Sequence, residues 1–454
     1  MAEARLTLIC AAVVALAGCG AGSDPAAKPA AAPKHAAAPV LLAPEIAEFY
    51  RDRGTRPVWV ADGALKPEAV ALAGRIARAA EHGLDPEAYD AGEIEAAIAS
   101  SRTGDKLALA RAELLLSRAY PAFARDLRGA GSEGGMRHID PGLEPETPPA
   151  RNLLEHAAAT QALGPEIASE LRMNPLYESL RLGYAQWRAS GGGSDAEEAL
   201  IRANLERARA IPAHDGRYII VDAASARLWM IEGSRVEGPM RVIVGKPAMQ
   251  TPAMAGLLRY VSLNPYWNMP PDLARDRARR VLREGTGFLA RERLQILSDW
   301  GDNPRVLSPA QVDWRSVASG KTSLRLRQLP GGDNVMGAVK FMMPNEMGIY
   351  LHDFPDKSLF ARSDRRLSSG CVRLADAPRL ARWLFGGTAP SPNGATPEQR
   401  VDLPEPVPVY ITYLTVLPGA KGGLTFQPDT YAREGAIRSG ALRTANRSVG
   451  RTGA

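Results

Sequence analysis

The spacing of apolar residues along this chain changes near residue 215. From about 44 to 210, apolar side chains recur at helical spacing, as Ala69, Leu72 and Ile76 do on one face of a helix. This pattern predicts an N-terminal helical domain over residues 44–210. Beyond the segment around Ala69, the pattern predicts helices near 105–127, 162–172 and 175–189.

Residues that start and stop helices mark boundaries within this domain. Gly83 is expected to end one helix, and Asp85 with the proline after it to begin the next. Ser194 and Glu197 have the spacing of a capping box at the start of the last helix. Pro121 is expected to kink or end its helix, because proline lacks the backbone donor.

After residue 215 the chain consists of short β-branched and aromatic runs separated by turn residues, which predicts a mainly β domain over 215–416. A charged, partly helical stretch at about 272–321 interrupts these runs, and we interpret it as an inserted lid. A helix capped by Asp376 is expected at about 377–385. The expected fold class is therefore α+β, with the helical domain first. The runs expected to form strands are 217–222, 227–231, 240–244, 258–263, 323–327, 339–342, 348–351 and 407–414.

The N-terminus resembles an export signal. Arg5 precedes an apolar run over 6–17, which is too short to span a bilayer and has the length of a signal-peptide core. The run ends in Leu16-Ala17-Gly18-Cys19, which is similar to a bacterial lipobox. We expect residues 1–18 to be a signal peptide and Cys19 to carry lipid. An ordinary signal peptide and an uncleaved anchor are the alternatives.

Two further segments carry little apolar periodicity. Residues 19–43 are rich in Ala and Pro and are expected to tether the folded domains to a membrane. Those domains are then expected in the periplasm, and Gly20 does not resemble an inner-membrane retention signal, which favours the outer membrane. The basic tail over 419–454 could contact anionic wall or lipid, but we expect a solvated end, loosely ordered past about 434.

Composition narrows the function class only slightly. The 454 residues are 45% hydrophobic, which is enough for more than one globular domain. The net charge of +6 would suit DNA, lipid headgroups or an acidic cell wall, and it equally suits an ordinary soluble surface. The charge therefore selects no partner.

The three cysteines have different fates. Cys10 lies inside the predicted signal and Cys19 would carry lipid, so Cys371 is the only thiol left in the folded part. A lone cysteine in an exported protein is either a buried, incidental residue or a reactive thiol. The backbone N–H groups of Ser369-Gly370-Cys371 would suit an oxyanion hole, because Gly370 adds no bulk.

A histidine could activate this thiol. His352 ends a predicted strand 19 positions earlier, and an imidazole can take the thiol proton and then hold the thiolate by charge. Asp353 could fix the histidine tautomer through its backbone carbonyl or its carboxylate. The alternative is a structural histidine and a packed core thiol, which spacing alone favours. No His, Cys or acidic cluster has metal spacing and no Gly-rich loop suits phosphate, so no metal or cofactor is expected.

The complete sequence motif around these two residues favours a reactive thiol over a packed core thiol. His-Asp at 352–353, followed after a loop by Ser-Gly-Cys-Val-Arg at 369–373, resembles the signature of the L,D-transpeptidase catalytic domain, also called the YkuD type. The similarity extends to the large branch of this family that carries a scaffold and a lid. Gly191-Gly192-Gly193 passes straight into the Ser194 helix, so the peptidoglycan-binding insert found in that branch is missing. The segments that share the similarity are 48–59, 82–86, 244–252, 264–271 and 327–345.

The resemblance implies a role for each residue of the motif. Cys371 is the nucleophile and His352 its base, while Gly370 and Cys371 supply oxyanion N–H groups. Arg373 orders the loop or meets a substrate carboxylate. Tyr350 and Trp267 line the donor site or simply pack in the β domain, and Ser369 is a catalytic group or a loop hydrogen-bonder.

The resemblance also implies a reaction. The thiolate attacks a peptidoglycan tetrapeptide stem, D-Ala leaves, and an amine of a second stem resolves the thioester to a 3→3 cross-link. Neither nucleic acid nor cofactor takes part, and carbapenems would acylate the thiol. Resolution by water or by a lysine of an envelope protein would instead make an L,D-carboxypeptidase or an anchoring enzyme. A non-catalytic wall-binding lipoprotein is the alternative from another class.

Overall fold

The computed structural model describes residues 40–129, 135–146, 148–419 and 422–435. The predicted signal peptide, the lipid site Cys19 and the tether up to residue 39 lie outside the described residues. The chain divides into two compact units. Unit 1 comprises Met1–Ala130 and Glu146–Met173, and unit 2 comprises Gly131–Pro145 and Asn174–Ala454. Within the described ranges, no helix has both the length and the apolar content needed to cross a membrane.

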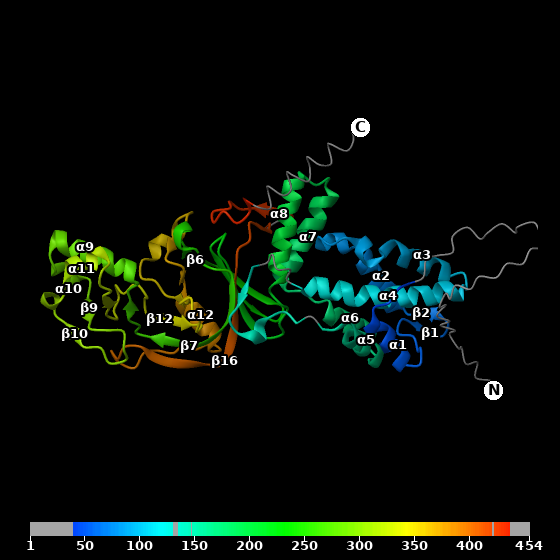
Figure 1. Ribbon diagram of the computed structural model, residues 1–454, viewed down its shortest axis with the longest axis horizontal. Helices are drawn as coiled ribbons and strands as arrows, with labels where there is room; N and C mark the ends of the chain where they lie inside the picture. Colours follow the sequence, from blue (N-terminus) through cyan, green and yellow to red (C-terminus); the bar gives the residue numbers. More distant parts are fainter. Residues whose placement is uncertain (1–39, 130–134, 147, 420–421, 436–454) are drawn as a thin grey trace, which may run out of the picture. The chain divides into compact units, whose positions relative to one another are not determined.

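Unit 1 is helical, as the apolar spacing predicts. Gly83 ends a short 3-10 helix in the left-handed conformation, and the Asp85 side chain caps the next by accepting from Glu87 N–H. The elements of unit 1 are α1 (Pro44–Asp52), β1 (Val60–Ala61), β2 (Ala64–Leu65), α2 (Pro67–Ala77), the 3-10 helices Ala79–His82 and Pro86–Tyr89, α3 (Ala91–Ser101), α4 (Lys106–Arg128), α5 (Ala150–Ala159) and α6 (Leu163–Glu170) (Figure 1).

Of the two outcomes predicted for Pro121, a kink or the end of its helix, the end is wrong. Helix α4 continues through this proline to Arg128. Tyr120 and Phe123 beside it are fully buried, so packing of the apolar face sustains the helix despite the missing backbone hydrogen bond.

A buried polar cluster joins α4 to the segments before it. The carboxylate of Glu113 accepts from Tyr50 Oη at 2.5 Å, from Val58 N at 2.6 Å and from Trp59 N at 2.8 Å. Ser117 Oγ accepts from Trp59 Nε1 at 2.8 Å. We call these five residues the Glu113 cluster. Both carboxylate oxygens are satisfied, which is what burial of an acid requires.

Unit 2 begins earlier in the chain than the expected domain border at 210. Helices α7 (Pro175–Ala189) and α8 (Asp195–Arg209) belong to it. The buried Asn174 amide donates to the carbonyls of Ala208 and Ile211, and buried Asn204 hydrogen-bonds with Thr415. The bonds of Asn174 join the start of α7 to the end of α8, and those of Asn204 attach the helix pair to the β part. The capping box predicted at Ser194 and Glu197 is present.

The β part of unit 2 is one large sheet that closes on itself. The strands follow the order β12-β13-β15-β6-β5-β4-β16-β7-β3, β14 adds to β6, and a further pairing of β12 with β7 closes the path. The strands are β3 (Arg137–His138), β4 (Arg217–Asp222), β5 (Arg227–Glu232), β6 (Arg235–Gly245), β7 (Met254–Leu263), β12 (Val339–Met342), β13 (Leu351–His352), β14 (Arg366–Ser368), β15 (Val372–Leu374) and β16 (Gln399–Thr412).

The main apolar core lies on one face of these strands. Strand β4 contributes Ile219 and Val221, and the helix α12 (Ala377–Leu384), capped by Asp376 as predicted, contributes Leu380. Alternate side chains such as Ile220 point to a second apolar cluster, as the two-residue period of a strand requires. Outside the insertion, the remaining elements of unit 2 are β17 (Val416–Pro418), β18 (Leu424–Phe426) and the 3-10 helices Pro141–Leu143, Pro247–Met249 and Lys357–Ala361. The α+β fold class with the helical part first is confirmed.

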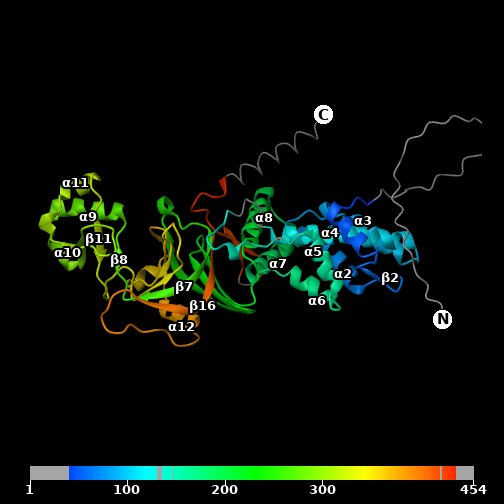
Figure 2. The ribbon, with the colours of Figure 1, turned by 60° about the horizontal axis from the view of Figure 1, so that its bottom comes forward.

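The insertion forms a small folded body of its own within unit 2. Its sheet has the order β10-β9-β11-β8, and Ile296 and Leu326 lie in an apolar core separate from that of the large sheet. The strand expected at 323–327 therefore belongs to the insertion. Its elements, which gather together in Figures 1 and 2, are β8 (Trp267–Asn268), α9 (Pro271–Glu284), α10 (Gly287–Arg291), β9 (Leu294–Leu297), β10 (Val306–Leu307), the 3-10 helix Pro309–Gln311, α11 (Trp314–Ser319) and β11 (Arg325–Gln328).

Part of the expected tail packs against the domain. Tyr431 and Glu434 are buried, and the hydroxyl of Tyr431 donates to the carbonyl of Gly245 at 2.5 Å. The expectation of a solvated end does not hold for Tyr431 and Glu434, because both side chains are buried and hydrogen-bonded. Residues 436–454 lie outside the described part of the chain.

Candidate active site

Strand register places the motif residues on one face. Strands β13 and β15 run parallel, with Leu351 opposite Val372 and His352 opposite Arg373. Leu351 and Val372 are fully buried in the main core. Because side chains alternate along a strand, His352 and Arg373 project from the other face, together with Cys371, which directly precedes β15.

Two further side chains join this face. Lys340 of β12 lies opposite His352 in the antiparallel ladder, so Lys340, His352 and Arg373 form a row across three strands. Tyr350 directly precedes β13, and its ring centroid lies 5.7 Å from that of His352. The sequence-based prediction missed Lys340, although it lies in the Val339-Lys340-Phe341 run that carried the resemblance.

Cys371 is partly exposed, and its sulfur is surrounded by polar groups. The thiol donates to the carbonyl of Gly348 at 3.5 Å, and both the N–H and the hydroxyl of Tyr350 hydrogen-bond to the sulfur. Desolvation raises the pKa of the thiol despite these hydrogen bonds, which lower it. At neutral pH the sulfur is therefore protonated.

His352 is 1% exposed, and its tautomer follows from one contact. Nδ1 lies 2.5 Å from the backbone carbonyl oxygen of Asp353. Because a carbonyl oxygen can only accept, Nδ1 carries the proton and Nε2 is left as an acceptor. Burial lowers the pKa of His352 to about 3, and the neighbouring charges of Arg373 and Lys340 act in the same direction.

The resting charges differ from the thiolate–imidazolium pair that the sequence suggests. The pKa of the thiol is raised and that of the imidazole is lowered, so both groups are neutral near pH 7. Burial is the main physical cause, because it disfavours the charged form of each group. Two cations beside the histidine also disfavour its protonated form. This arrangement suits a histidine that accepts the proton only as the sulfur attacks.

Asp353 acts on the histidine through its backbone, which is one of the two routes the sequence allows. Its carboxylate is engaged elsewhere, accepting from Lys357 Nζ at 2.7 Å and from Ala338 N at 3.0 Å. Although burial opposes the shift, these hydrogen bonds lower the pKa of Asp353, so the side chain remains charged.

The loop before Cys371 is held by Ser368, a residue that the sequence-based prediction missed. Ser368 Oγ donates to the carbonyl of Cys371 at 2.6 Å and accepts from Gly370 N at 3.1 Å. Ser369, which was expected as the catalytic or loop hydrogen-bonding serine, is exposed. The neighbouring Ser-Ser pair gives no sequence signal for which hydroxyl points inward.

This geometry revises the expected oxyanion hole. The N–H of Gly370 already donates to Ser368, so it does not point freely into the site. The N–H of Cys371 has no acceptor among the hydrogen bonds of the described residues, which leaves it available for an oxyanion. Gly370 itself has φ of +116°, and a Cβ there would lie 3.2 Å from Ile349 Cδ1, so glycine is required for conformation and space.

Among the described residues, Arg373 has no carboxylate as a partner. Its Nε has no hydrogen-bond partner and its guanidinium lies 4.3 Å from the centroid of Phe354. Burial lowers the pKa of Arg373, which nevertheless stays charged. By contrast, Lys340 pairs with Glu398 at 2.9 Å. Arg373 is therefore the cation on this face that lacks an anionic partner among the described residues.

Trp267, expected to line the donor site or to pack, is part of the insertion. It lies opposite Gln328 in the small sheet and packs against the core of that body. A packing role is what its described contacts support.

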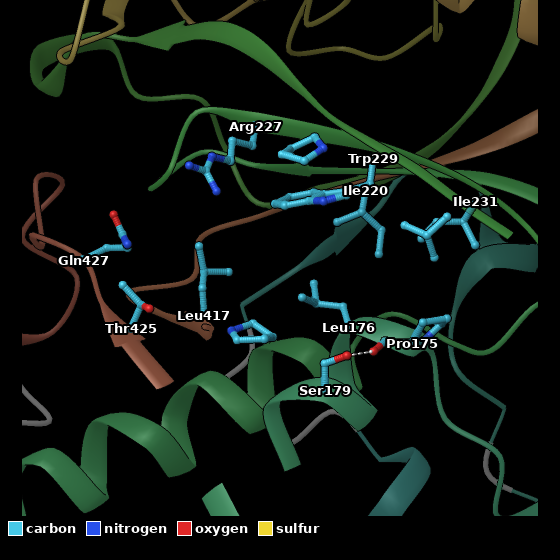
Figure 3. Close-up of a pocket in the computed structure, with 13 residues that line it drawn as sticks. Pro175, Leu176, Ser179, Ile220, Arg227, Trp229, Ile231, Leu417, Thr425 and Gln427 are labelled. Atoms are coloured by element: carbon cyan, nitrogen blue, oxygen red, sulfur yellow. Dashed lines mark hydrogen bonds between the residues drawn. The ribbon is translucent and has the colours of Figure 1, made fainter. Parts of the chain in front are cut away.

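Two cavities lie outside this face. One of about 460 Å³ is lined by apolar side chains such as Leu176 of α7 and Trp229 of β5, with Arg227 at its edge (Figure 3). Another of about 400 Å³ is lined partly by Met347 and Pro252, next to residues that contact the Cys371 loop. In unit 1, His156, Glu166 and Glu170 bring possible metal-ligand atoms within 4.8 Å, a grouping that the sequence spacing did not indicate.

Comparisons with known proteins agree with the resemblance. Residues 44–182 match the Scaffold domain family and residues 216–411 match the L,D-transpeptidase catalytic domain family. The chain is 33% identical over 235 residues to a Haemophilus influenzae protein named "Putative L,D-transpeptidase", covering 50% of this chain and 46% of that protein. The chain thus spans about half the length of this relative.

Two solved structures are also similar. An L,D-transpeptidase from Mycobacterium smegmatis shares 14% identity over 43% of this chain and 58% of its own, with a TM-score of 0.20. The Ldtfm-avibactam carbamoyl enzyme shares 15% identity over 45% of this chain and 51% of its own, with a TM-score of 0.21.

Proposed function

We propose, for a chain that belongs to the L,D-transpeptidase family, that Cys371 transfers an acyl group from a peptidoglycan tetrapeptide stem to an amine of a second stem. The proposal depends on one geometric observation. Parallel pairing of β13 with β15 brings Cys371, His352 and Arg373 to a single face, with Nε2 of the histidine unprotonated.

The first half-reaction forms a thioester. As the Cys371 sulfur attacks the carbonyl between the third residue of the stem and the terminal D-Ala, its proton passes to His352 Nε2. The carbonyl oxygen becomes an oxyanion, and the N–H of Cys371 stabilises it. The C–N bond then breaks, and the histidine returns the proton to the departing D-Ala amine.

The second half-reaction consumes the thioester. The side-chain amine of a second stem attacks the same carbonyl and loses a proton to His352. The C–S bond breaks, the sulfur recovers the proton, and a 3→3 amide cross-link remains. The reaction needs no ATP, because the energy of the peptide bond is conserved in the thioester.

Arg373 is proposed to bind a carboxylate of the donor stem. A partly buried guanidinium with no acid partner gains most from a charged ligand that replaces lost solvation. A peptide stem ending in D-Ala carries such a carboxylate. Binding there would orient the scissile carbonyl toward the sulfur.

The acceptor separates this proposal from its nearest alternatives. Purified protein incubated with disaccharide-tetrapeptide is expected to release D-Ala and give cross-linked dimers, which muropeptide analysis detects. Shortened monomers alone would indicate that water resolves the thioester, as in an L,D-carboxypeptidase. No change in the muropeptides, with full binding to the wall, would favour the non-catalytic alternative.

We also propose that the protein is anchored in the periplasm through lipid on Cys19, because the sequence around this residue resembles a lipobox. Metabolic labelling with a radioactive fatty acid should mark the wild-type chain and not Cys19→Ala. Equal labelling of both, or labelling of neither, would contradict lipidation at this residue.

A further inference from the structure

A threonine buried behind the Cys371 loop connects two backbone segments. Thr251 is fully buried, and its hydroxyl accepts from Gly245 N at 2.8 Å and donates to the carbonyl of Gly370 at 2.8 Å. Since the hydroxyl has a single proton, the direction of both bonds is fixed by the backbone groups that it meets. The carbonyl of Gly370 is therefore held in one orientation.

The approach of these segments depends on a glycine. A Cβ at Gly245 would overlap the backbone of Met249 and would lie 2.6 Å from Thr251 N. No side chain can be accommodated at this distance, so the close contact between Gly245 and Thr251 is built into the sequence.

Tyr431 completes the connection from the far end of the chain. Its hydroxyl donates to the carbonyl of Gly245 at 2.5 Å and lies 3.5 Å from Thr251 N, which points at it as a donor. Its ring stacks on Tyr413, with centroids 5.0 Å apart. Residue 431 lies beyond the 216–411 segment that matches the catalytic domain family, so this contact is contributed by the chain's own extension.

Two residues that follow Tyr431 also hold the extension in place. Arg433 donates to the side-chain oxygen of Gln250 at 3.1 Å and to the carbonyl of Thr251 at 3.2 Å. Glu434 is buried and accepts from Thr415 Oγ1 at 2.8 Å. We call residues 429–434 the C-terminal strap.

The effect on the site follows from peptide geometry. A trans peptide is planar, with its carbonyl and its N–H pointing in opposite directions. The carbonyl of Gly370 and the N–H of Cys371 belong to the same peptide, so fixing one fixes the other. With the carbonyl drawn inward to Thr251, the N–H of Cys371 points away from the buried side, where no protein acceptor is described for it.

We infer that Thr251, supported by Tyr431 of the C-terminal strap, is a positioning residue that aims the Cys371 N–H at the oxyanion of the acyl-transfer reaction. The inference rests on the proposed function. Neither side chain touches the substrate. Their contribution is made in the transition state, because only there does a full negative charge form on the carbonyl oxygen.

Two reactions of the same sulfur test this role. Acylation by meropenem or by a tetrapeptide passes through an oxyanion, whereas alkylation by iodoacetamide is a direct displacement that forms none. Thr251→Val keeps the side-chain shape and removes the hydroxyl, and Thr251→Ser keeps the hydroxyl. Valine is expected to slow acylation by about 100-fold, as for a misplaced oxyanion donor, while alkylation changes little. Serine should restore most of the acylation rate.

A second pair of variants covers the case in which Thr251→Val does not fold. Tyr431→Phe removes only the strap hydroxyl and is expected to slow acylation by about tenfold at unchanged alkylation rate. Tyr184→Phe is the matched control, because it removes a buried hydroxyl that bonds to Glu198, away from the Cys371 loop. It should leave both rates unchanged.

The outcomes separate the inference from the proposed function. If the wild-type chain is alkylated but never acylated, the proposed acyl transfer fails. If the wild-type chain is acylated and Thr251→Val and Tyr431→Phe are acylated equally fast, the positioning role fails while the function stands. An equal loss of acylation and alkylation in both variants would also contradict it, since that result indicates a disturbed loop rather than a misaimed N–H.

Discussion

Two buried clusters built around a tyrosine differ in how completely their polar atoms are paired. In the Glu113 cluster of unit 1, both carboxylate oxygens accept hydrogen bonds from Tyr50, Val58 and Trp59. Around Tyr350 in unit 2, neither Nε of Arg373 nor the N–H of Cys371 has a hydrogen-bond partner in the described part of the chain.

The degree of pairing distinguishes polar groups that stabilise the fold from polar groups that are free to bind a ligand. Unpaired buried donors cost stability, so a fold retains them only where something else supplies the acceptor. Mutation of the satisfied cluster should therefore lower the free energy of unfolding, whereas mutation of the unsatisfied cluster should change the kinetics of the reaction.

The largest effect is expected at His352. Replacing it with glutamine removes the group that accepts the thiol proton while keeping a polar side chain of similar size. Acylation should fall by about 10²- to 10⁴-fold, the range for losing a general base. Stopped-flow or mass-spectrometric acylation rates measure this, and a variant that keeps the wild-type rate would show that another group takes the proton.

On the stabilising side, Glu113→Ala leaves the buried N–H groups of Val58 and Trp59 without an acceptor, while the hydroxyl of Tyr50 keeps its hydrogen bond with Ser117. We expect a loss of about 3 kcal/mol in the free energy of unfolding of unit 1, measured by urea denaturation, with acylation by the folded protein unchanged. Glu95→Ala on the exposed face of α3 is the matched control, expected within about 0.5 kcal/mol of the wild type. A Glu113 variant as stable as this control would refute the contrast.

At Arg373, substitution by glutamine removes the charge proposed to bind the stem carboxylate. The KM for the tetrapeptide donor is expected to rise about tenfold, corresponding to one charge-assisted contact. Exposed Arg382→Gln serves as the control for a general change in charge. If only the melting temperature of the variant falls, Arg373 stabilises the fold and does not bind the stem.

The smallest effect concerns the pH dependence of alkylation. Because the pKa of the Cys371 thiol is raised, its thiolate fraction at pH 7 should be lower than that of a free cysteine. The rate of reaction with iodoacetamide should rise with pH and reach half of its maximum above about pH 8.5. A rate already at half of its maximum near pH 6 would indicate a preformed thiolate–imidazolium pair.

The sequence predicts those parts of the fold that depend on local pattern. Strand β12 occupies the predicted residues 339–342, and the caps at Ser194 and Asp376 lie where expected, because capping involves near neighbours in the chain. Pro121 shows the limit of local rules, since burial of its neighbours outweighs the lost hydrogen bond.

The site is predicted less completely, for a physical reason. Cys371 and His352 lie in a recognisable string, and their shared face follows from strand pairing. The inward hydroxyl of Ser368 and the contribution of Thr251 depend on side-chain directions that the string does not encode. The neutral resting charges depend on burial and on Lys340, which only the folded sheet brings beside His352.

The proposed function requires that one sulfur, Cys371, becomes acylated. Intact-mass spectrometry after exposure to meropenem tests it most directly, with Cys371→Ala as the comparison. The wild-type chain should gain the mass of one adduct, and Cys371→Ala should gain none. An adduct on Cys371→Ala, or none on a folded wild-type protein, would contradict the account.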